Sequence, residues 1–200
     1  RRAIAAQRAT TAVFYSISNC QEGLRGVPLG NFLIKQVVDE LKRELPDLRT
    51  FVTLSPVPGF VGWLRRERTA ATATWLSDDD RRTLAEIDES GWQETAVKTR
   101  ALRPLLTASL AEYLLRARSR GGRPVDPVAR FHLNNGARLE RLNWLGDVSA
   151  KGLAQGAGFM VNYLYDVGQI ERNHEAFARE GRVIAARAVQ KALRPQAAAA

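Results

Sequence analysis

Cysteine is nearly absent from this chain of 200 residues, in which Cys20 is the single example. One cysteine forms no internal disulfide, and it supplies no cysteine-based zinc site. A chain without a disulfide framework is typical of a reducing compartment, such as the cytoplasm or the mitochondrial matrix. We therefore expect the fold to rest on a hydrophobic core.

Long apolar runs are also missing, and no stretch approaches the roughly 18 consecutive apolar residues of a membrane helix. Arg1, Arg2 and Arg8 stand near the N-terminus without the apolar segment of a secretory signal. The chain ends in alanines at 197–200, so we expect no peroxisomal Ser-Lys-Leu signal. With 45% apolar residues, the sequence predicts one compact domain rather than a disordered tail.

Lysine is scarce, since only five of the thirty basic residues are lysines and the rest are arginines. The net charge of +9 raises the question of a nucleic-acid partner. The arginines are scattered, however, and no basic stripe with interleaved aromatics or zinc-finger signature accompanies them. Arginine forms bidentate contacts with anions, so a phosphorylated small molecule fits as well as DNA. We expect no nucleic-acid partner.

The first part of the chain alternates between strand and helix patterns. Residues 11–18 are rich in aromatic and β-branched types and predict a buried strand, and residues 48–54 predict a second. Between them, residues 28–45 carry an apolar stripe at helical spacing, from Leu29 to Leu45. A strand, helix and strand of this length predict two parallel strands. Ligands gather at the carboxyl ends of such strands, where the loops 19–30 and 55–59 open.

Residues 60–124 read as a helical, irregular insertion. Ser77 is placed to cap a helix that begins with three aspartates, because acidic side chains favour the positive end of the helix dipole. Pro104 is placed to open another helix, which the glycine pair at 121–122 follows. We expect this insertion to lie within a domain that spans residues 1–200.

The segment 126–137 has two interpretations. Asn135-Gly136 suits a hairpin turn after a strand at 128–133. Alternatively, Asp126 as N-cap, Pro127 as first helical residue and Gly136 as C-terminal glycine frame a short helix. We favour the helix, which places His132 on its core-facing side. Beyond it we expect strands at 138–145 and 159–165, with a glycine-rich stretch at 151–158 between them, and a terminal helix at 169–193.

Two features carry candidate chemistry. The loop at 23–30 leads from a strand into a helix N-terminus, where free backbone N–H groups and Arg25 favour a phosphate. It lacks the P-loop and dinucleotide patterns, so its spacing alone also fits an ordinary connection. Ser55 precedes Pro56 and is held extended, but no nucleophile elbow surrounds it. A partly buried histidine such as His132 is more often structural than catalytic.

Four stretches together resemble the C-terminal catalytic part of the malonyl-CoA decarboxylases: FYSISNCQEGLRGVPLGNFLIKQVVDEL at 14–41, TLSPVPGF at 53–60, DPVARFHLNNGARLERLNWLGDVS at 126–149 and GFMVNYLY at 158–165. They follow the family's order over most of the chain. The resemblance implies a mixed α/β fold similar to that of the GNAT acetyltransferases, a twisted sheet flanked by helices. In that fold two parallel strands splay apart and hold acyl-CoA between them.

The resemblance also assigns residues to roles. The family's active-site serine matches Ser55 and its histidine matches His132, while a tyrosine near the active site matches Tyr165. The loop that holds the CoA pyrophosphate corresponds to Arg25, Gly26, Val27, Pro28, Leu29, Gly30 and Asn31. Animal members of the family carry a glutamate at the position of Pro28, so no role of that acid transfers here. The implied chemistry needs neither a metal nor an organic cofactor.

The resemblance implies that this chain decarboxylates malonyl-CoA to acetyl-CoA and CO2. It further implies that the chain is a fragment, without the family's N-terminal helical domain, and that the protein forms homo-oligomers through that domain. Two alternatives are an N-acyltransferase that uses acyl-CoA and a basic, non-enzymatic nucleic-acid-binding domain. Release of CO2 from malonyl-CoA supplied alone separates the first alternative from a decarboxylase, and salt-sensitive nucleic-acid binding identifies the second.

Overall fold

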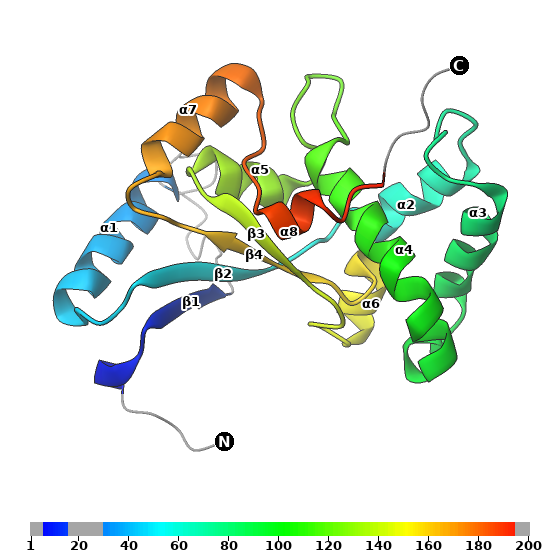
Figure 1. Ribbon diagram of the computed structural model, residues 1–200, viewed down its shortest axis with the longest axis horizontal. Helices are drawn as coiled ribbons and strands as arrows, with labels where there is room; N and C mark the ends of the chain where they lie inside the picture. Colours follow the sequence, from blue (N-terminus) through cyan, green and yellow to red (C-terminus); the bar gives the residue numbers. More distant parts are fainter. Residues whose placement is uncertain (1–5, 16–29, 195–200) are drawn as a thin grey trace, which may run out of the picture. The chain divides into compact units, whose positions relative to one another are not determined.

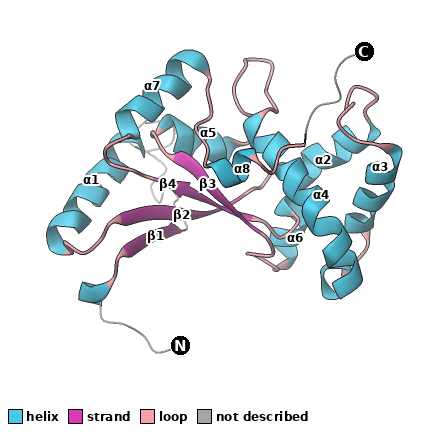
Figure 2. Ribbon diagram, viewed as in Figure 1, coloured by secondary structure: helices cyan, strands magenta, loops and turns pink. Residues whose placement is uncertain are grey.

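A computed structural model describes residues 6–15 and 30–194 of the chain. Four strands form one sheet with the order β1-β2-β4-β3, and helices make up most of the remainder (Figure 2). The predicted mixed α/β class is confirmed. The strands are β1 (Thr11–Tyr15), β2 (Thr50–Pro56), β3 (Arg138–Asn143) and β4 (Met160–Leu164). The helices are α1 (Gly30–Glu44), α2 (Phe60–Thr69), α3 (Asp78–Ala85), α4 (Ala96–Leu115), α5 (Pro127–Asn134), α6 (Ala150–Gly156), α7 (Ile170–Glu180) and α8 (Arg187–Gln190), with short 3-10 turns at Ala6–Arg8, Glu86–Asp88 and Trp92–Glu94.

The strands β1 and β2 are parallel, as the strand-helix-strand pattern predicts. Their register pairs Thr11 with Thr50 and continues to Tyr15 with Leu54. The two strands are therefore paired along the whole of β1. Residues 16–29 lie outside the described part of the chain. The second strand runs to Pro56, two residues further than expected, so Ser55 belongs to the strand rather than to the turn.

The strand β4 lies between β2 and β3 and runs against β2. The N–H of Tyr165 donates to the carbonyl of Phe51 at 2.8 Å, and the N–H of Tyr163 donates to Oγ1 of Thr53 at 3.2 Å. The residue number rises along one strand as it falls along the other, which defines an antiparallel pair. Alternate residues of this segment, Tyr163 and Tyr165 among them, are buried as the alternation predicts.

The chain divides into two compact units. Unit 1 comprises Arg1–Ser55, Val128–Arg141 and Val161–Ala186, and unit 2 comprises Pro56–Pro127, Leu142–Met160 and Arg187–Ala200. Unit 1 contains most of the sheet, together with α1, α7 and nearly all of α5. Unit 2 contains the helices α2, α3, α4, α6 and α8. The predicted single domain over residues 1–200 stays a prediction.

In unit 1, the helices α1, α5 and α7 neighbour one another beside the strands (Figure 1). Lys35 of α1 pairs with Glu171 of α7 at 3.8 Å, and Asn173 of α7 donates to the carbonyl of Gly136, just after α5, at 3.2 Å. Within α1, Val38 is fully buried whereas Val37 is 38% exposed. The four-residue spacing from Leu29 to Leu45 also places Val37 in the predicted stripe, and this placement is wrong because the buried side is centred on Val38.

In unit 2, aromatic side chains fill the space between helices. Phe60 contacts Trp63, Tyr113 and Phe159, with ring centroids 5.7 to 6.3 Å apart. The predicted cap at Ser77 is confirmed as a capping box, in which Ser77 and Asp80 each bond to the other's backbone N–H.

Pro104 lies inside α4, which begins eight residues earlier, so its predicted place at a helix start is wrong. Proline removes one hydrogen bond from a helix interior. Here the loss is offset by the burial of the leucines on either side, including Leu102, Leu105 and Leu106.

Near the C-terminus, the structure defines one segment for which no element was predicted and corrects one expected helix. The glycine-rich stretch at 151–158 is largely helical, because Ser149 caps α6 by accepting a hydrogen bond from the N–H of Gly152. The single helix expected over 169–193 is broken at Gly181, whose φ of 64° ends α7 in the left-handed region. The chain then runs past Leu139 of β3, where Ala185 forms a parallel bridge, before α8 begins.

Candidate active site

The helix α5 brings His132 to the sheet. The structure confirms the helical interpretation of residues 126–137, and the hairpin alternative is wrong because Pro127–Asn134 is helical. Pro127 is the first helical residue, and Gly136 follows the helix with a φ of 76°. His132 is only 2% exposed, which places it on the core-facing side as predicted.

Two hydroxyl side chains contact the ring of this histidine. Oγ of Ser55 lies 3.0 Å from Nε2 of His132, and the hydroxyl oxygen of Tyr165 lies 2.8 Å from Nδ1. Ser55 is 5% exposed and Tyr165 is 1% exposed. All three residues belong to unit 1, with Ser55 near the end of β2 and Tyr165 just after β4. The structure therefore joins, through direct hydrogen bonds, the three residues that the sequence singled out.

Two further residues hold this arrangement and were not singled out as site residues. The ring of Tyr163 stacks on the imidazole of His132 with centroids 4.5 Å apart and planes at 23°. Oγ of Ser55 lies 2.9 Å from Oγ1 of Thr53, which is fully buried. The signal for Thr53 is its spacing of two from Ser55, since alternate residues of a strand share a face.

Burial sets the protonation state of the site. Removal from water lowers the pKa of His132 to about 4, because the buried imidazolium loses its hydration. Burial likewise raises the pKa of Tyr165 above its ordinary value of 10. At neutral pH the histidine is therefore a neutral imidazole that donates through one ring nitrogen and accepts through the other. Such a group relays hydrogen bonds between its two hydroxyl neighbours.

The predicted anion loop falls largely outside the described residues. Arg25, Gly26, Val27, Pro28 and Leu29 lie within residues 16–29, as does Cys20. Gly30 and Asn31 open α1. The assignment of this loop to a pyrophosphate stays a prediction.

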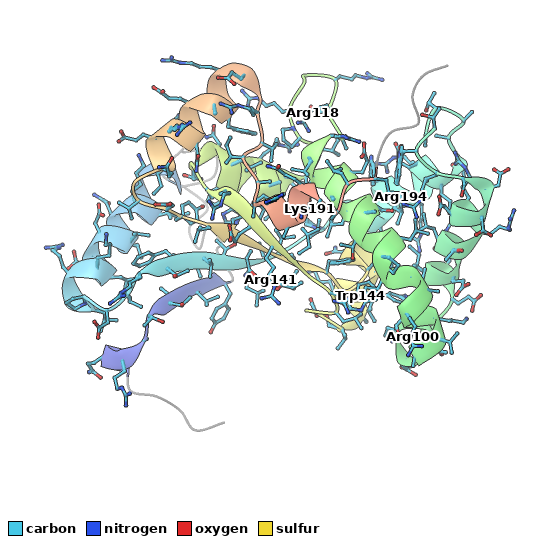
Figure 3. The ribbon with its side chains drawn as sticks, in the orientation of Figure 1. Arg100, Arg118, Arg141, Trp144, Lys191 and Arg194 are labelled. Atoms are coloured by element: carbon cyan, nitrogen blue, oxygen red, sulfur yellow. The ribbon has the colours of Figure 1, made fainter. Side chains whose placement is uncertain are left out.

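Many arginines of unit 2 have structural partners. The guanidinium of Arg81 donates to four backbone carbonyls, those of Glu67, Arg68, Ala70 and Ala73. Arg194 bonds to Asp80 of α3 at 2.6 Å, and Arg118, just after α4, donates to the carbonyl of Leu115 at 2.8 Å (Figure 3). Part of the positive charge therefore serves the fold.

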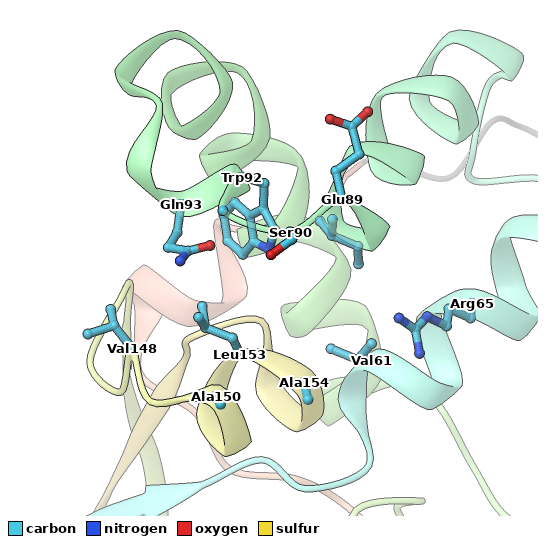
Figure 4. Close-up of a pocket in the computed structure, with 12 residues that line it drawn as sticks. Val61, Arg65, Glu89, Ser90, Trp92, Gln93, Val148, Ala150, Leu153 and Ala154 are labelled. Carbon is cyan, nitrogen blue, oxygen red and sulfur yellow. The ribbon is translucent and has the colours of Figure 1, made fainter.

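A separate hollow of about 470 Å³ lies in unit 2 (Figure 4). Its lining includes Trp92 and, on α6, Leu153. Two charged side chains of its lining are paired, Arg65 with Asp88 and Glu89 with Lys98. Because Arg65 and Glu89 are already paired within the protein, we assign no catalytic or substrate-binding role to this hollow.

Among residues 6–15 and 30–194, no group of three or more His, Cys, Asp or Glu side chains is placed to hold a metal ion. None of the helices described there is both long and apolar enough to cross a bilayer. Chemistry without a cofactor stays a prediction.

The four-stranded sheet and its flanking helices define an α/β protein whose fold is consistent with that of the GNAT acetyltransferases, and this fold carries the buried cluster of Ser55, His132 and Tyr165. Comparison with known families is more specific. The sequence profile of the malonyl-CoA decarboxylase C-terminal domain matches residues 1–200, and the chain belongs to this family.

Relatives agree with this membership. Mitochondrial malonyl-CoA decarboxylase of the goose Anser anser anser is 40% identical over 190 residues, which cover 86% of this chain and 38% of the relative. The crystal structure of malonyl-CoA decarboxylase from Rhodopseudomonas palustris matches with a TM-score of 0.92 and 56% identity, covering 97% of this chain and 44% of that one. The crystal structure of malonyl-CoA decarboxylase from Agrobacterium vitis matches with a TM-score of 0.93 and 54% identity, covering 98% of this chain and 48% of that one. The chain thus spans less than half the length of these relatives.

Proposed function

We propose that the protein containing this chain converts malonyl-CoA to acetyl-CoA and CO2. Family membership supports the substrate, since the goose, Rhodopseudomonas and Agrobacterium relatives carry the name malonyl-CoA decarboxylase. The observation that carries the proposal is the hydrogen-bonded series of Ser55, His132 and Tyr165 in a buried site. These groups supply what the reaction requires.

The reaction breaks the bond between the α-carbon and the carboxylate carbon. The electron pair of that bond moves into the thioester, which becomes an enolate, and CO2 leaves. The α-carbon then takes a proton, and one proton enters from solvent for each turnover. The thioester is the electron sink, so catalysis needs hydrogen-bond donors at its oxygen, a carboxylate held out of the carbonyl plane and a proton donor.

We assign these tasks to Ser55 and His132. Ser55 hydrogen-bonds the malonyl carboxylate or the thioester oxygen, and His132 provides the proton for the α-carbon. Because Nε2 of His132 faces Oγ of Ser55 at 3.0 Å, the geometry favours passage of that proton through the serine hydroxyl. Tyr165 bonds Nδ1 and thereby orients the ring. A well-placed donor of this kind contributes about 3–4 kcal/mol to transition-state stabilisation.

The remaining proposals concern CoA binding, cofactors, partners and cellular compartment. We propose that the loop from Arg25 to Asn31 holds the CoA pyrophosphate, with free N–H groups at the start of α1 as donors. We further propose catalysis without a metal or organic cofactor, a homo-oligomeric assembly and no nucleic-acid partner. The goose relative is named as mitochondrial, and we propose the mitochondrial matrix or the cytoplasm for this protein.

The test is incubation of the complete protein with malonyl-CoA and no amine acceptor, with acetyl-CoA and CO2 as the two readouts. Equal release of both products is expected. An acyltransferase with the same fold releases no CO2 under these conditions. Absence of CO2 from folded protein that still binds acetyl-CoA contradicts the proposal.

A further inference from the structure

Thr53 faces the site from the middle of β2. Its side chain is fully buried, and Phe51, Thr53 and Ser55 make up the buried face of the strand. The hydroxyl oxygen of Thr53 lies 2.9 Å from Oγ of Ser55, and it accepts the N–H of Tyr163 at 3.2 Å. A backbone N–H can only donate, so the N–H of Tyr163 occupies one lone pair of the Thr53 oxygen. The other lone pair and the hydroxyl hydrogen of Thr53 are available to Ser55.

The three hydroxyls and the imidazole form a hydrogen-bonded series that has four mobile hydrogens for three hydrogen bonds. Tyr165, His132, Ser55 and Thr53 each carry one mobile hydrogen in the neutral state. They are joined by three contacts, of 2.8, 3.0 and 2.9 Å. Three hydrogens fill the three links, so one hydrogen is left over. Its position depends on which way the hydroxyls turn, because hydroxyl hydrogens rotate without movement of heavy atoms.

Two arrangements matter. When Ser55 donates to Thr53, the surplus hydrogen is on Thr53 and Ser55 offers none to a ligand. When Thr53 instead donates to Ser55, and Nε2–H of His132 does so as well, the hydrogen of Ser55 is free. An anionic carboxylate or enolate oxygen favours the second arrangement, because hydrogen bonds to charged acceptors are about twice as strong as neutral ones.

We propose that Thr53 is a positioning residue for Ser55. When the site is empty, Thr53 accepts the hydroxyl hydrogen of Ser55. When the hydroxyl of Ser55 turns to the substrate, Thr53 donates its own hydroxyl hydrogen to Oγ of Ser55. This inference rests on the proposed decarboxylation. Thr53 itself touches no reacting atom in this scheme. It acts by keeping Ser55 in one rotamer and by completing the hydrogen bonds around it in both arrangements.

The test compares Thr53→Val with Thr53→Ser in the complete protein. Valine keeps the volume and the branched shape but lacks the hydroxyl, whereas serine keeps the hydroxyl. We expect Thr53→Val to lower kcat by about tenfold to a hundredfold, with KM changed by less than about threefold. Thr53→Ser is expected to stay within about threefold of wild type. Equal kcat in wild type and Thr53→Val overturns the inference while leaving the proposed decarboxylation in place.

Thr53→Val removes the hydroxyl that accepts the N–H of Tyr163, and this loss can prevent folding. A measurement on the unmodified protein covers that case. The ring nitrogen-15 signals of His132, identified by their loss in His132→Asn, report which nitrogen carries the proton. We expect the proton on Nε2 both in the empty protein and with saturating acetyl-CoA, because Nε2–H donates to Ser55 in both arrangements. A proton on Nδ1 overturns the inference, because Nε2 then cannot donate to Ser55. Inactive wild-type protein overturns the proposed function, and the inference with it.

Discussion

Oγ of Ser55 and Nε2 of His132 lie 3.0 Å apart, although 77 positions separate the two residues in the chain. One belongs to β2 and the other to α5, so the contact exists only in the folded unit. Both side chains are buried, which removes competing water and strengthens the hydrogen bond. The relationship makes the two side chains one functional group.

Loss of either partner is expected to impair turnover more than binding. His132→Asn and Ser55→Ala should each lower kcat by about a hundredfold to a thousandfold while acetyl-CoA binding, measured by calorimetry, is retained. His174→Asn is the matched control, since that histidine bonds the carbonyl of Asn134 and lies outside the cluster. Near wild-type decarboxylation by His132→Asn contradicts the assignment.

Tyr165→Phe removes the partner of Nδ1 and keeps the ring. We expect kcat to fall by roughly tenfold, the value of one neutral hydrogen bond, because the imidazole is no longer held in one tautomer. Tyr15→Phe makes the same chemical change at a side chain that is 74% exposed, and it should leave turnover unchanged. Equal rates for the two variants show that Tyr165 has no part in orienting the ring.

The lowered pKa of His132 links stability to pH. The folded protein holds the imidazole neutral down to about pH 4, whereas the unfolded chain takes up the proton near 6.5. This contribution to stability is complete above about pH 6.5 and is lost as the pH falls toward 4. Its size is about 3 kcal/mol, from 1.36 kcal/mol per unit of pKa. We expect urea unfolding to show that the free energy of unfolding falls less between pH 7 and pH 4.5 in His132→Asn than in wild type. An equal fall in the two proteins contradicts the linkage to His132.

Gly136 is expected to tolerate no side chain. Its φ is 76°, and a Cβ there meets the carbonyl oxygen of Ile170 at 2.2 Å. Gly136→Ala should lower the free energy of unfolding by about 3 kcal/mol or more, from backbone strain and overpacking together. Gly122 has a similar φ of 74° with nothing within 4 Å, so Gly122→Ala should cost only about 1–2 kcal/mol. Denaturant unfolding of both variants compares the two costs, and equal values contradict the packing argument.

Arg81 is expected to stabilise unit 2 through its four carbonyl contacts. Lysine has a single nitrogen and cannot reproduce the planar fork, so Arg81→Lys should cost about 2–3 kcal/mol in thermal or urea unfolding. The neighbouring Arg82→Lys is the control, because Arg82 forms an exposed pair with Asp79 at 3.3 Å and should matter by less than about 0.5 kcal/mol. Similar losses in both variants refute a special role for Arg81.

Local signals accounted for much of the fold. The helix over 127–134 follows from Pro127 and Gly136, and the cap of α3 follows from Ser77. The same reasoning failed at Pro104, where buried leucines on both sides outweigh the local preference of proline. It also failed at Gly181, which ends α7 although the surrounding arginine-rich segment looks continuous. In both cases the decisive term is a contact or a backbone conformation that side-chain periodicity does not encode.

The sequence by itself determined the class of the fold, the parallel pair of strands and, through its family motifs, the importance of Ser55, His132 and Tyr165. These features depend on local pattern and residue identity. Only the tertiary structure decided that the three side chains share hydrogen bonds, that Thr53 joins them and that the imidazole is neutral. Distances across 77 positions and loss of hydration arise when strands and helix pack together, and no single segment carries that information.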